Sequence, residues 1–226
     1  MPANPVTQLR QYLRKKRELQ LFKQSSSEDV FTHIYEENKW GDGDSRSGKG
    51  SNLDRTKPLR QRLPQVLREL GIRSLLDIPC GDFFWMKETN ISVERYIGAD
   101  IVASLAQENQ RLYGSSKRQF LQLDLLRDEL PTTDAILCRD CLVHLCFEDI
   151  EKAVVYIKAS GATYLLRRVF LTNKKNKDIV SGKHRSLNMR IPPLHWPKPI
   201  MEIPEHITNN SRGSKCLAVW KITDIR

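Results

Sequence analysis

The sequence has few cysteines and no long apolar run. Five cysteines in 226 residues, an odd number at irregular spacing, argue against a secreted fold held by disulfides. No segment approaches the roughly 18 consecutive apolar residues that a membrane-spanning helix needs. The first 16 residues also lack the apolar core of a secretory signal. We therefore expect a cytoplasmic protein without a transmembrane segment.

Residue types that can bind a metal lie close together at one place in the sequence, between positions 138 and 146. They are Cys138, Cys141, His144 and Cys146. A strong zinc site needs a second pair of ligands at a defined spacing, and the sequence has no such pair. We expect no bound metal, and we expect Cys138 to end a buried strand.

Acidic residues are outnumbered. Lys and Arg total 37 against 27 Asp and Glu, which gives a formal net charge of +10 and favours anionic partners. Half of that excess lies in residues 1–24, where six basic residues face the single acid Glu18. The remaining chain is only mildly basic, so a nucleic-acid partner is possible but not favoured.

Residues 1–52 are expected to form a basic helical arm followed by a loop. Residues 6–23 have the pattern of a basic amphipathic helix, which fits a peripheral membrane or partner contact or simply a solvated helix. A second helix is expected over residues 28–39. The glycine- and serine-rich residues 40–52 lack the order of a phosphate-binding P-loop. They fit either a lid anchored by Trp40 or a plain linker.

Residues 53–226 alternate between strand and helix patterns. A helix over residues 56–70 ends at Gly71, and the next helices are expected at 83–88, 102–113 and 147–159. Strands are expected at 74–78, 96–100, 119–123, 135–138, 163–166 and, after a proline-rich loop at 192–204, at 216–222. This order predicts an α/β fold with a Rossmann-like, doubly wound, mostly parallel sheet of about seven strands. An antiparallel C-terminal strand and N-terminal helices complete it.

An acid stands at or just after each of four predicted strands, namely Asp77, Asp100, Asp124 and Asp140. Ligands of open parallel sheets bind beyond the carboxyl ends of the strands. Asp100 follows Asp77 by 23 residues, close to the spacing of about 20 expected for an acid that binds a ribose. The alternative for Asp100 is a helix N-cap.

The segment 75–81, Leu-Leu-Asp-Ile-Pro-Cys-Gly, resembles the first motif of class I S-adenosylmethionine-dependent methyltransferases. The resemblance extends over residues 73–170. The whole chain is similar to a bacterial-type group whose members share four features. These are a Trp-Gly/Ser-Gly-rich N-terminal segment, here residues 40–51, and a first loop like Leu-Asp-Pro-Cys-Gly-Asp, here residues 77–85. The others are an Arg-Asp…His motif after the fourth strand, here residues 139–144, and an Asn- and Pro-rich tail, here residues 176–199. The resemblance implies S-adenosylmethionine as cofactor, bound by Trp40, Asp77, Pro79, Cys80, Gly81, Asp82, Trp85, Asp100, Ile101, Asp124, Leu125 and Arg139.

The first motif departs from the family pattern at two positions. Pro79 and Phe83 stand where the family has glycine, so that only Gly81 remains. The glycines of a dinucleotide fingerprint admit a pyrophosphate, and a loop with one glycine leaves little room for it. The sequence therefore disfavours NAD and FAD.

Catalysis would centre on the segment after the fourth strand. Methylation of a hydroxyl benefits from a base, and His144 is the best candidate, with Asp140 as its orienter or as an alternative base. We expect Arg185 and Asn188 to contact a small-molecule or glycan acceptor, methylated on oxygen. Two alternatives stay open: an RNA or protein methyltransferase that uses the basic arm, and a non-catalytic binding module with this fold.

Overall fold

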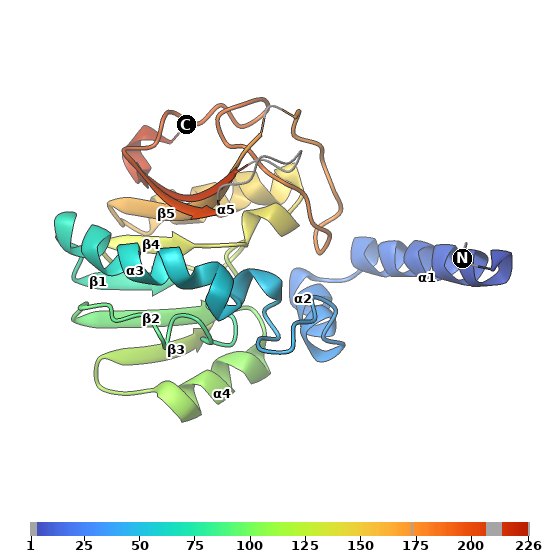
Figure 1. Cartoon of the computed structure of the whole chain (residues 1–226), viewed down its shortest axis with the longest axis horizontal. Coiled ribbons are helices and arrows are strands. Elements are labelled where there is room, and N and C mark those ends of the chain that lie inside the picture. Colours follow the sequence, from blue (N-terminus) through green and yellow to red (C-terminus); the bar gives the residue numbers. More distant parts are fainter. Residues whose placement is uncertain (1–3, 173, 207–213, 226) are drawn as a thin grey trace.

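A seven-stranded sheet organises this computed structural model, which describes residues 4–172, 174–206 and 214–225. The strands stand in the order β3-β2-β1-β4-β5-β7-β6 (Figure 1). Their bounds are β1 Ser74–Asp77, β2 Arg95–Asp100, β3 Arg118–Gln122, β4 Ala135–Cys138, β5 Tyr164–Leu171, β6 Met201–His206 and β7 Ser214–Lys221.

The sheet is mostly parallel. β3, β2, β1, β4 and β5 pair in parallel, while β7 runs antiparallel to both of its neighbours, β5 and β6. The prediction of a doubly wound sheet of about seven strands with an antiparallel C-terminal strand is therefore confirmed. The strand order reverses between β1 and β4, and this switch point is where open sheets of this kind bind ligands.

Helices cover both faces of the sheet. α3 (Leu53–Glu69) and α5 (Phe147–Ala159) pack in separate hydrophobic clusters on opposite faces. α4 (Ala103–Tyr113) lies along β2 and β3. The 3-10 turns are η1 Lys49–Ser51, η2 Leu142–His144 and η3 Ile222–Asp224. α3 presents Leu59, Leu63 and Leu67 at helical spacing, all buried, and the Asn52 side chain caps it by accepting a bond from the Asp54 amide.

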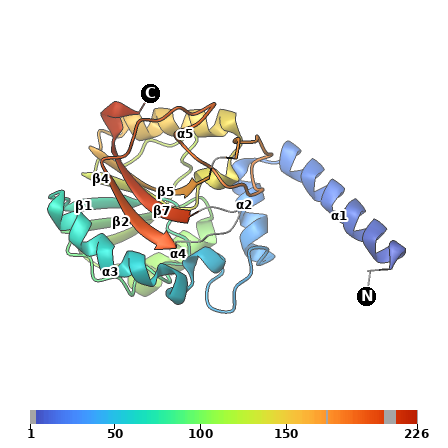
Figure 2. The same cartoon turned by 45° about the horizontal axis from the view of Figure 1, so that its top comes forward.

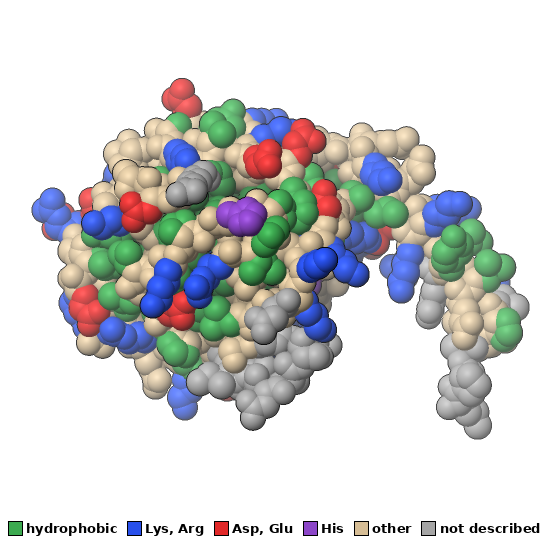
Figure 3. Space-filling view, turned by 90° about the horizontal axis from the view of Figure 1, so that it is seen from above, with side chains coloured by type: hydrophobic (Ala, Val, Ile, Leu, Met, Phe, Trp, Pro, Cys, Tyr) green, Lys and Arg blue, Asp and Glu red, His purple; other side chains and the backbone are tan. Residues whose placement is uncertain are grey.

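The N-terminal helix α1 (Pro5–Gln24) projects from the body (Figures 1 and 2). It is tied near its end, where Glu18 pairs with Lys39 at 2.6 Å and Phe22 packs against α2 (Ser27–Glu36). Farther out, Leu9 and Tyr12 are exposed, and hydrophobic and basic side chains adjoin on the helix (Figure 3). Its role as a membrane or partner contact stays a prediction. No described helix has both the length and the apolar character to cross a bilayer.

Two local predictions were wrong. The expected helix at residues 83–88 is a series of turns, because Phe83 has a left-handed backbone (φ 56°) while its ring is buried between Tyr96, Tyr113 and Phe120. The end of the proline-rich loop is instead strand β6. Pro204 fits there because β6 is the edge strand, with a register shift after this residue, so the missing amide disturbs no central ladder.

Candidate functional site

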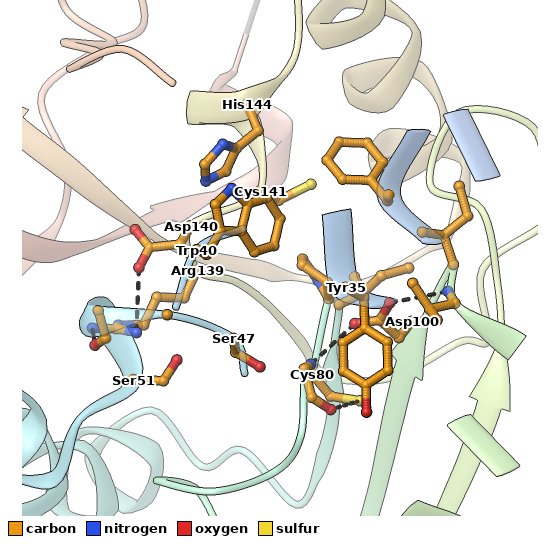
Figure 4. A pocket seen from close by; sticks show the side chains of 18 of the residues that line it. Tyr35, Trp40, Ser47, Ser51, Cys80, Asp100, Arg139, Asp140, Cys141 and His144 are labelled. Carbon is orange, nitrogen blue, oxygen red and sulfur yellow. Dashed lines mark hydrogen bonds and ion pairs between the residues drawn. The ribbon is translucent and has the colours of Figure 1, made fainter. Parts of the chain in front are cut away.

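A cavity of about 370 Å³ opens at the carboxyl ends of the parallel strands, a size typical of small-ligand sites. The ends of β1, β2, β4 and β5 form its floor. The loop of residues 40–51, here called the lid loop, and the α2 side chains Phe31 and Tyr35 form its outer wall (Figure 4). The cavity therefore lies at the switch point of the sheet, beyond the carboxyl ends of the strands.

The loop after β1 turns sharply at Gly81. Gly81 has a φ of 57°, and a Cβ atom there would lie 2.2 Å from the Ser47 hydroxyl oxygen of the lid loop. The Gly81 amide donates to Asp100 Oδ2 at 3.1 Å, and its carbonyl accepts from the Asn109 side chain at 2.7 Å. Only glycine fits this left-handed turn with the lid loop so close, and its amide is already used within the protein.

Asp77 and Asp100 are buried at the ends of β1 and β2. Burial raises the pKa of Asp77 to about 7, although the Tyr96 hydroxyl donates to its Oδ2 at 2.6 Å. Burial likewise raises the pKa of Asp100 to about 6, against the backbone amides of Val102 and Gly81 that donate to it. Each carboxyl group pays a desolvation cost that its protein partners do not fully offset.

Asp124 completes a row of three carboxyl groups along β1, β2 and β3. It is 7% exposed, and burial raises its pKa. Its Oδ1 accepts from the Leu126 amide at 2.9 Å, and Arg127 lies 3.6 Å from its Oδ2. Three buried acids on one rim favour a ligand that brings hydroxyl, amine or cationic groups to them.

A buried ion cluster follows β4. Arg139 donates to Glu205 through Nε (3.2 Å) and Nη2 (3.0 Å), and Arg168 contacts both Glu205 and Asp140. Arg139 Nη2 also donates to the Gly50 carbonyl at 2.8 Å, which fastens the lid loop to the cluster. Asp140 has a left-handed backbone (φ 57°), and burial raises the pKa of its carboxyl group.

His144 lies in η2 at the cavity wall. Its Nδ1 is 3.0 Å from the Lys183 carbonyl oxygen, and since a carbonyl only accepts, Nδ1 carries the proton and Nε2 is free to accept. Burial lowers the pKa of His144 to about 3. The ring packs against Trp40, with centroids 4.7 Å apart (Figure 4). His144 is therefore a neutral hydrogen-bond acceptor facing the cavity.

The lid loop is fastened at a second point, Asp82. The Asp82 carboxylate accepts from the Ser45 hydroxyl (2.8 Å), the Arg46 amide (2.9 Å) and the Ser47 hydroxyl (3.0 Å). The Asp82 amide in turn donates to Ser47 Oγ at 2.9 Å. These contacts place residues 45–50 over the cavity.

Most of the residues that the sequence singled out line this one cavity. They are Trp40, Asp77, Pro79, Cys80, Gly81, Trp85, Asp100, Ile101, Asp124, Leu125, Arg139, Asp140 and His144. Asp82 does not line it, because its side chain is taken up by the lid loop. Cys141 lines the cavity and Cys138 is buried at the end of β4. Within the described residues, no three His, Cys, Asp or Glu side chains gather as a metal site.

Arg185 and Asn188 lie outside the cavity lining. Arg185 Nη1 donates to the Leu145 carbonyl at 2.6 Å, and the guanidinium lies over the Phe147 ring, 5.0 Å from its centre. The Asn188 amide donates to the Thr172 carbonyl at 2.9 Å. Both side chains therefore tie the tail to the body and do not line the cavity.

The sequence did not reveal the site residues that lie far from the first motif along the chain. They are Phe31 and Tyr35 on α2, Arg168 and Phe170 on β5, Glu205 on β6 and Lys215 on β7. The signal for Arg168 was present: a charged pair, Arg167-Arg168, interrupts an apolar strand. A buried charge in a central strand requires a partner of opposite sign.

Several solved structures with the same fold are methyltransferases, although no protein-family model and no curated protein matches the sequence. N-methyltransferase NodS from Bradyrhizobium japonicum, in complex with S-adenosyl-L-homocysteine, aligns with a TM-score of 0.59 at 13% identity, covering 83% of this chain and 97% of that chain. Magnesium protoporphyrin IX methyltransferase from Synechocystis, with bound S-adenosylmethionine, gives 0.55 at 12%, covering 86% and 96%. The methyltransferase domain of bacterial CtHen1 gives 0.54 at 12%, covering 75% and 100%. The chain therefore has the fold of class I methyltransferases.

Proposed function

We propose that the protein is an S-adenosylmethionine-dependent methyltransferase that methylates an oxygen atom of a small molecule or glycan. One observation carries the proposal: the buried carboxyl groups of Asp77, Asp100 and Asp124 line a single cavity at the switch point of the sheet. The shared fold adds support, because two of the solved structures contain S-adenosylmethionine or S-adenosylhomocysteine.

The cavity suits an adenosyl sulfonium better than a dinucleotide. In the proposal, Asp100 accepts the ribose hydroxyl protons, Asp124 and Leu125 border the adenine, and Asp77 with the Gly81 loop borders the methionine part. A pyrophosphate would instead meet three carboxyl groups and a loop whose Gly81 amide already donates to Asp100. When bound, S-adenosylmethionine supplies a methyl group activated on a sulfonium.

The residues of the protein then position the acceptor. His144, held neutral with its Nε2 free, accepts a hydrogen bond from the acceptor hydroxyl and orients its oxygen. Asp140 is the alternative proton acceptor, although Arg168 holds its Oδ2. Trp40 and the lid loop exclude water from the cavity, which strengthens the electrostatic interactions inside it.

Cofactor affinity is expected to rise with pH. Asp77 and Asp100, with pKa values near 7 and 6, are partly protonated before ligand binds near neutral pH. A cationic ligand with ribose hydroxyls favours the ionised carboxylates, so binding releases protons. Below these pKa values the affinity should therefore fall by up to about tenfold per pH unit for each carboxyl that must ionise. Calorimetric titrations between about pH 5 and 8, in buffers of different ionisation enthalpy, measure both effects; a constant affinity with no proton release would contradict the assignment.

Replacing His144 with alanine is expected to lower turnover by about tenfold, the effect of losing one hydrogen bond that orients the acceptor hydroxyl. Cofactor affinity should change far less, because His144 contacts the acceptor side of the cavity. Single-turnover kinetics and a cofactor titration on the same variant separate the two quantities. Equal losses in turnover and in cofactor affinity would make His144 a structural residue. A larger loss of turnover in an Asp140→Asn variant than in the His144 variant would make Asp140 the proton acceptor.

Methyl transfer itself is the test of the activity. The full chain is incubated with S-adenosylmethionine and a library of hydroxylated small molecules and glycans, and S-adenosylhomocysteine is quantified by mass spectrometry. Acceptor-dependent product supports the proposal. Cofactor binding without product from any acceptor, RNA and protein included, would favour the non-catalytic module instead. Product with RNA alone, lost on deleting residues 1–24, would favour the nucleic-acid alternative.

A further inference from the structure

Charge is divided between the two halves of the cavity. Acidic side chains follow three strands on one side: Asp77 on β1, Asp100 on β2 and Asp124 after β3. Basic side chains belong to three strands on the other: Arg139 after β4, Arg168 on β5 and Lys215 on β7. Since the strands stand in the order β3-β2-β1-β4-β5-β7, the acids and the bases occupy opposite halves of the sheet edge. A cofactor bound as proposed above occupies the acidic half, and the basic half then faces the acceptor.

The two arginines of the basic half are neutralised within the protein. Arg139 and Arg168 share the carboxylates of Glu205 and Asp140, so two positive charges meet two negative ones. Lys215 adds a third positive charge to this half. Burial raises the pKa of Asp140 and Glu205, and the Lys215 charge opposes this rise from a distance, but no carboxylate of the described residues forms a direct ion pair with its ammonium. An unpaired ammonium that is partly withdrawn from water favours an anion beside it.

Lys215 is held at the cavity by its cross-strand partner. It pairs in register with Phe170 of β5, and its Nζ lies 4.9 Å from the centre of the Phe170 ring. The rings then continue toward the catalytic histidine: Phe170 to His184 is 6.1 Å and His184 to His144 is 5.3 Å between centroids. A wall of rings thus connects the Lys215 ammonium with the neutral His144.

Three more basic side chains line the same cavity; Arg46 lies over the tyrosine ring of α2, and the other two belong to η1 and α3. Lys49 of η1 and Arg55 in the first turn of α3 are exposed, and neither forms an ion pair with a described residue. Gly50, the middle residue of η1, is bonded through its carbonyl to Arg139, which places η1 and the start of α3 beside the basic half. The mouth of this half therefore has an excess of positive charge.

We propose that the acceptor carries an anionic group, a carboxylate or a phosphate, which binds Lys215 with Lys49 and Arg55 at the entrance. Its ring or carbon skeleton lies along Phe170 and His184, and its hydroxyl reaches His144. This inference rests on the proposed function, because it assigns the acidic half of the cavity to the cofactor. It narrows the acceptor to hydroxylated acids and phosphate esters, acidic sugars among them.

The test compares matched probes on protein saturated with S-adenosylhomocysteine. Glucuronate, glucose 6-phosphate and glucose share a sugar ring and differ in charge, so calorimetric or NMR titration isolates the contribution of the anion. We expect both anions to bind at least about tenfold more tightly than glucose, about 1.4 kcal/mol, with the difference shrinking at high salt. The stronger of the two anions identifies the carboxylate or the phosphate as the preferred group.

Lys215→Met should weaken the binding of both anions at least about tenfold, and Lys215→Arg should restore it. Lys221→Met is the matched control, because Lys221 is exposed at the opposite end of β7. Equal binding of glucose and the anions, no binding of any probe, or an unchanged affinity in Lys215→Met would each overturn the inference. Titration of S-adenosylhomocysteine on the same samples distinguishes the two failures. If S-adenosylhomocysteine does not bind, the proposed function is wrong. If it binds but the anionic probes bind no more tightly than glucose, only the anion inference is wrong.

Discussion

Replacing Glu205 with glutamine is expected to lower the free energy of unfolding by about 3–5 kcal/mol, the cost of removing one partner from a buried ion cluster. Its carboxylate is held by Arg139 and Arg168 and is almost fully buried, with 2% of the side chain exposed. Without it, two buried guanidinium groups would share the single carboxylate of Asp140. The amide of glutamine keeps the shape but supplies no charge.

Urea unfolding followed by circular dichroism measures this loss as a lower midpoint at unchanged slope. Glu202→Gln is the matched control, since Glu202 lies on the same strand and is exposed; it should change stability by less than about 0.5 kcal/mol. A loss below about 1 kcal/mol in Glu205→Gln would mean that the cluster contributes little to the fold.

Replacing Asp100 with alanine is expected to weaken S-adenosylmethionine binding by at least about tenfold, or 1.4 kcal/mol. The side chain is 6% exposed, and its free acceptor capacity faces the cavity. Hydrogen bonds to a charged group contribute about 1.5–3 kcal/mol each, and a ribose diol offers two. Calorimetric titration of the variant and the unmodified chain gives the ratio of dissociation constants.

Asp100 also accepts from the Gly81 and Val102 amides, so alanine could loosen the loop itself. Asp100→Asn removes the charge and keeps one of these two backbone bonds through its amide oxygen, so it disturbs the loop less than alanine does. Glu129→Gln, an exposed carboxyl group after β3, is the control. If Asp100→Asn binds the cofactor as tightly as the unmodified chain, the ribose assignment is wrong.

The periodic part of the fold could be predicted from local sequence. β1 to β4, α4 and α5 follow from alternating apolar strands and helices with apolar faces, such as the buried Ile150, Ala153 and Ile157 of α5. Strand β6 could not, because Pro204 and two glutamates hide a strand whose position at the edge tolerates them. The turns at Phe83 likewise depend on aromatic rings distant in the chain.

The sequence predicts the part of the candidate site that lies at the ends of the parallel strands. Asp77, Asp100 and Asp124 follow apolar strands, and the common edge of a parallel sheet brings them together. Glu205 and Lys215 come from β6 and β7, whose place in the sheet depends on the antiparallel return of the tail. Asp82 shows the opposite limit: its motif position suggested a ligand contact, but the lid loop, distant in sequence, supplies its hydrogen-bond donors.

The central claim is that the buried carboxyl groups at the strand ends bind a phosphate-free adenosyl sulfonium. Calorimetric titration of the full chain with S-adenosylmethionine, S-adenosylhomocysteine and NAD tests it most directly. The account predicts saturable binding of the first two and no binding of NAD. Binding of NAD without S-adenosylmethionine, or the absence of binding by either adenosyl ligand at neutral pH and above, would contradict it.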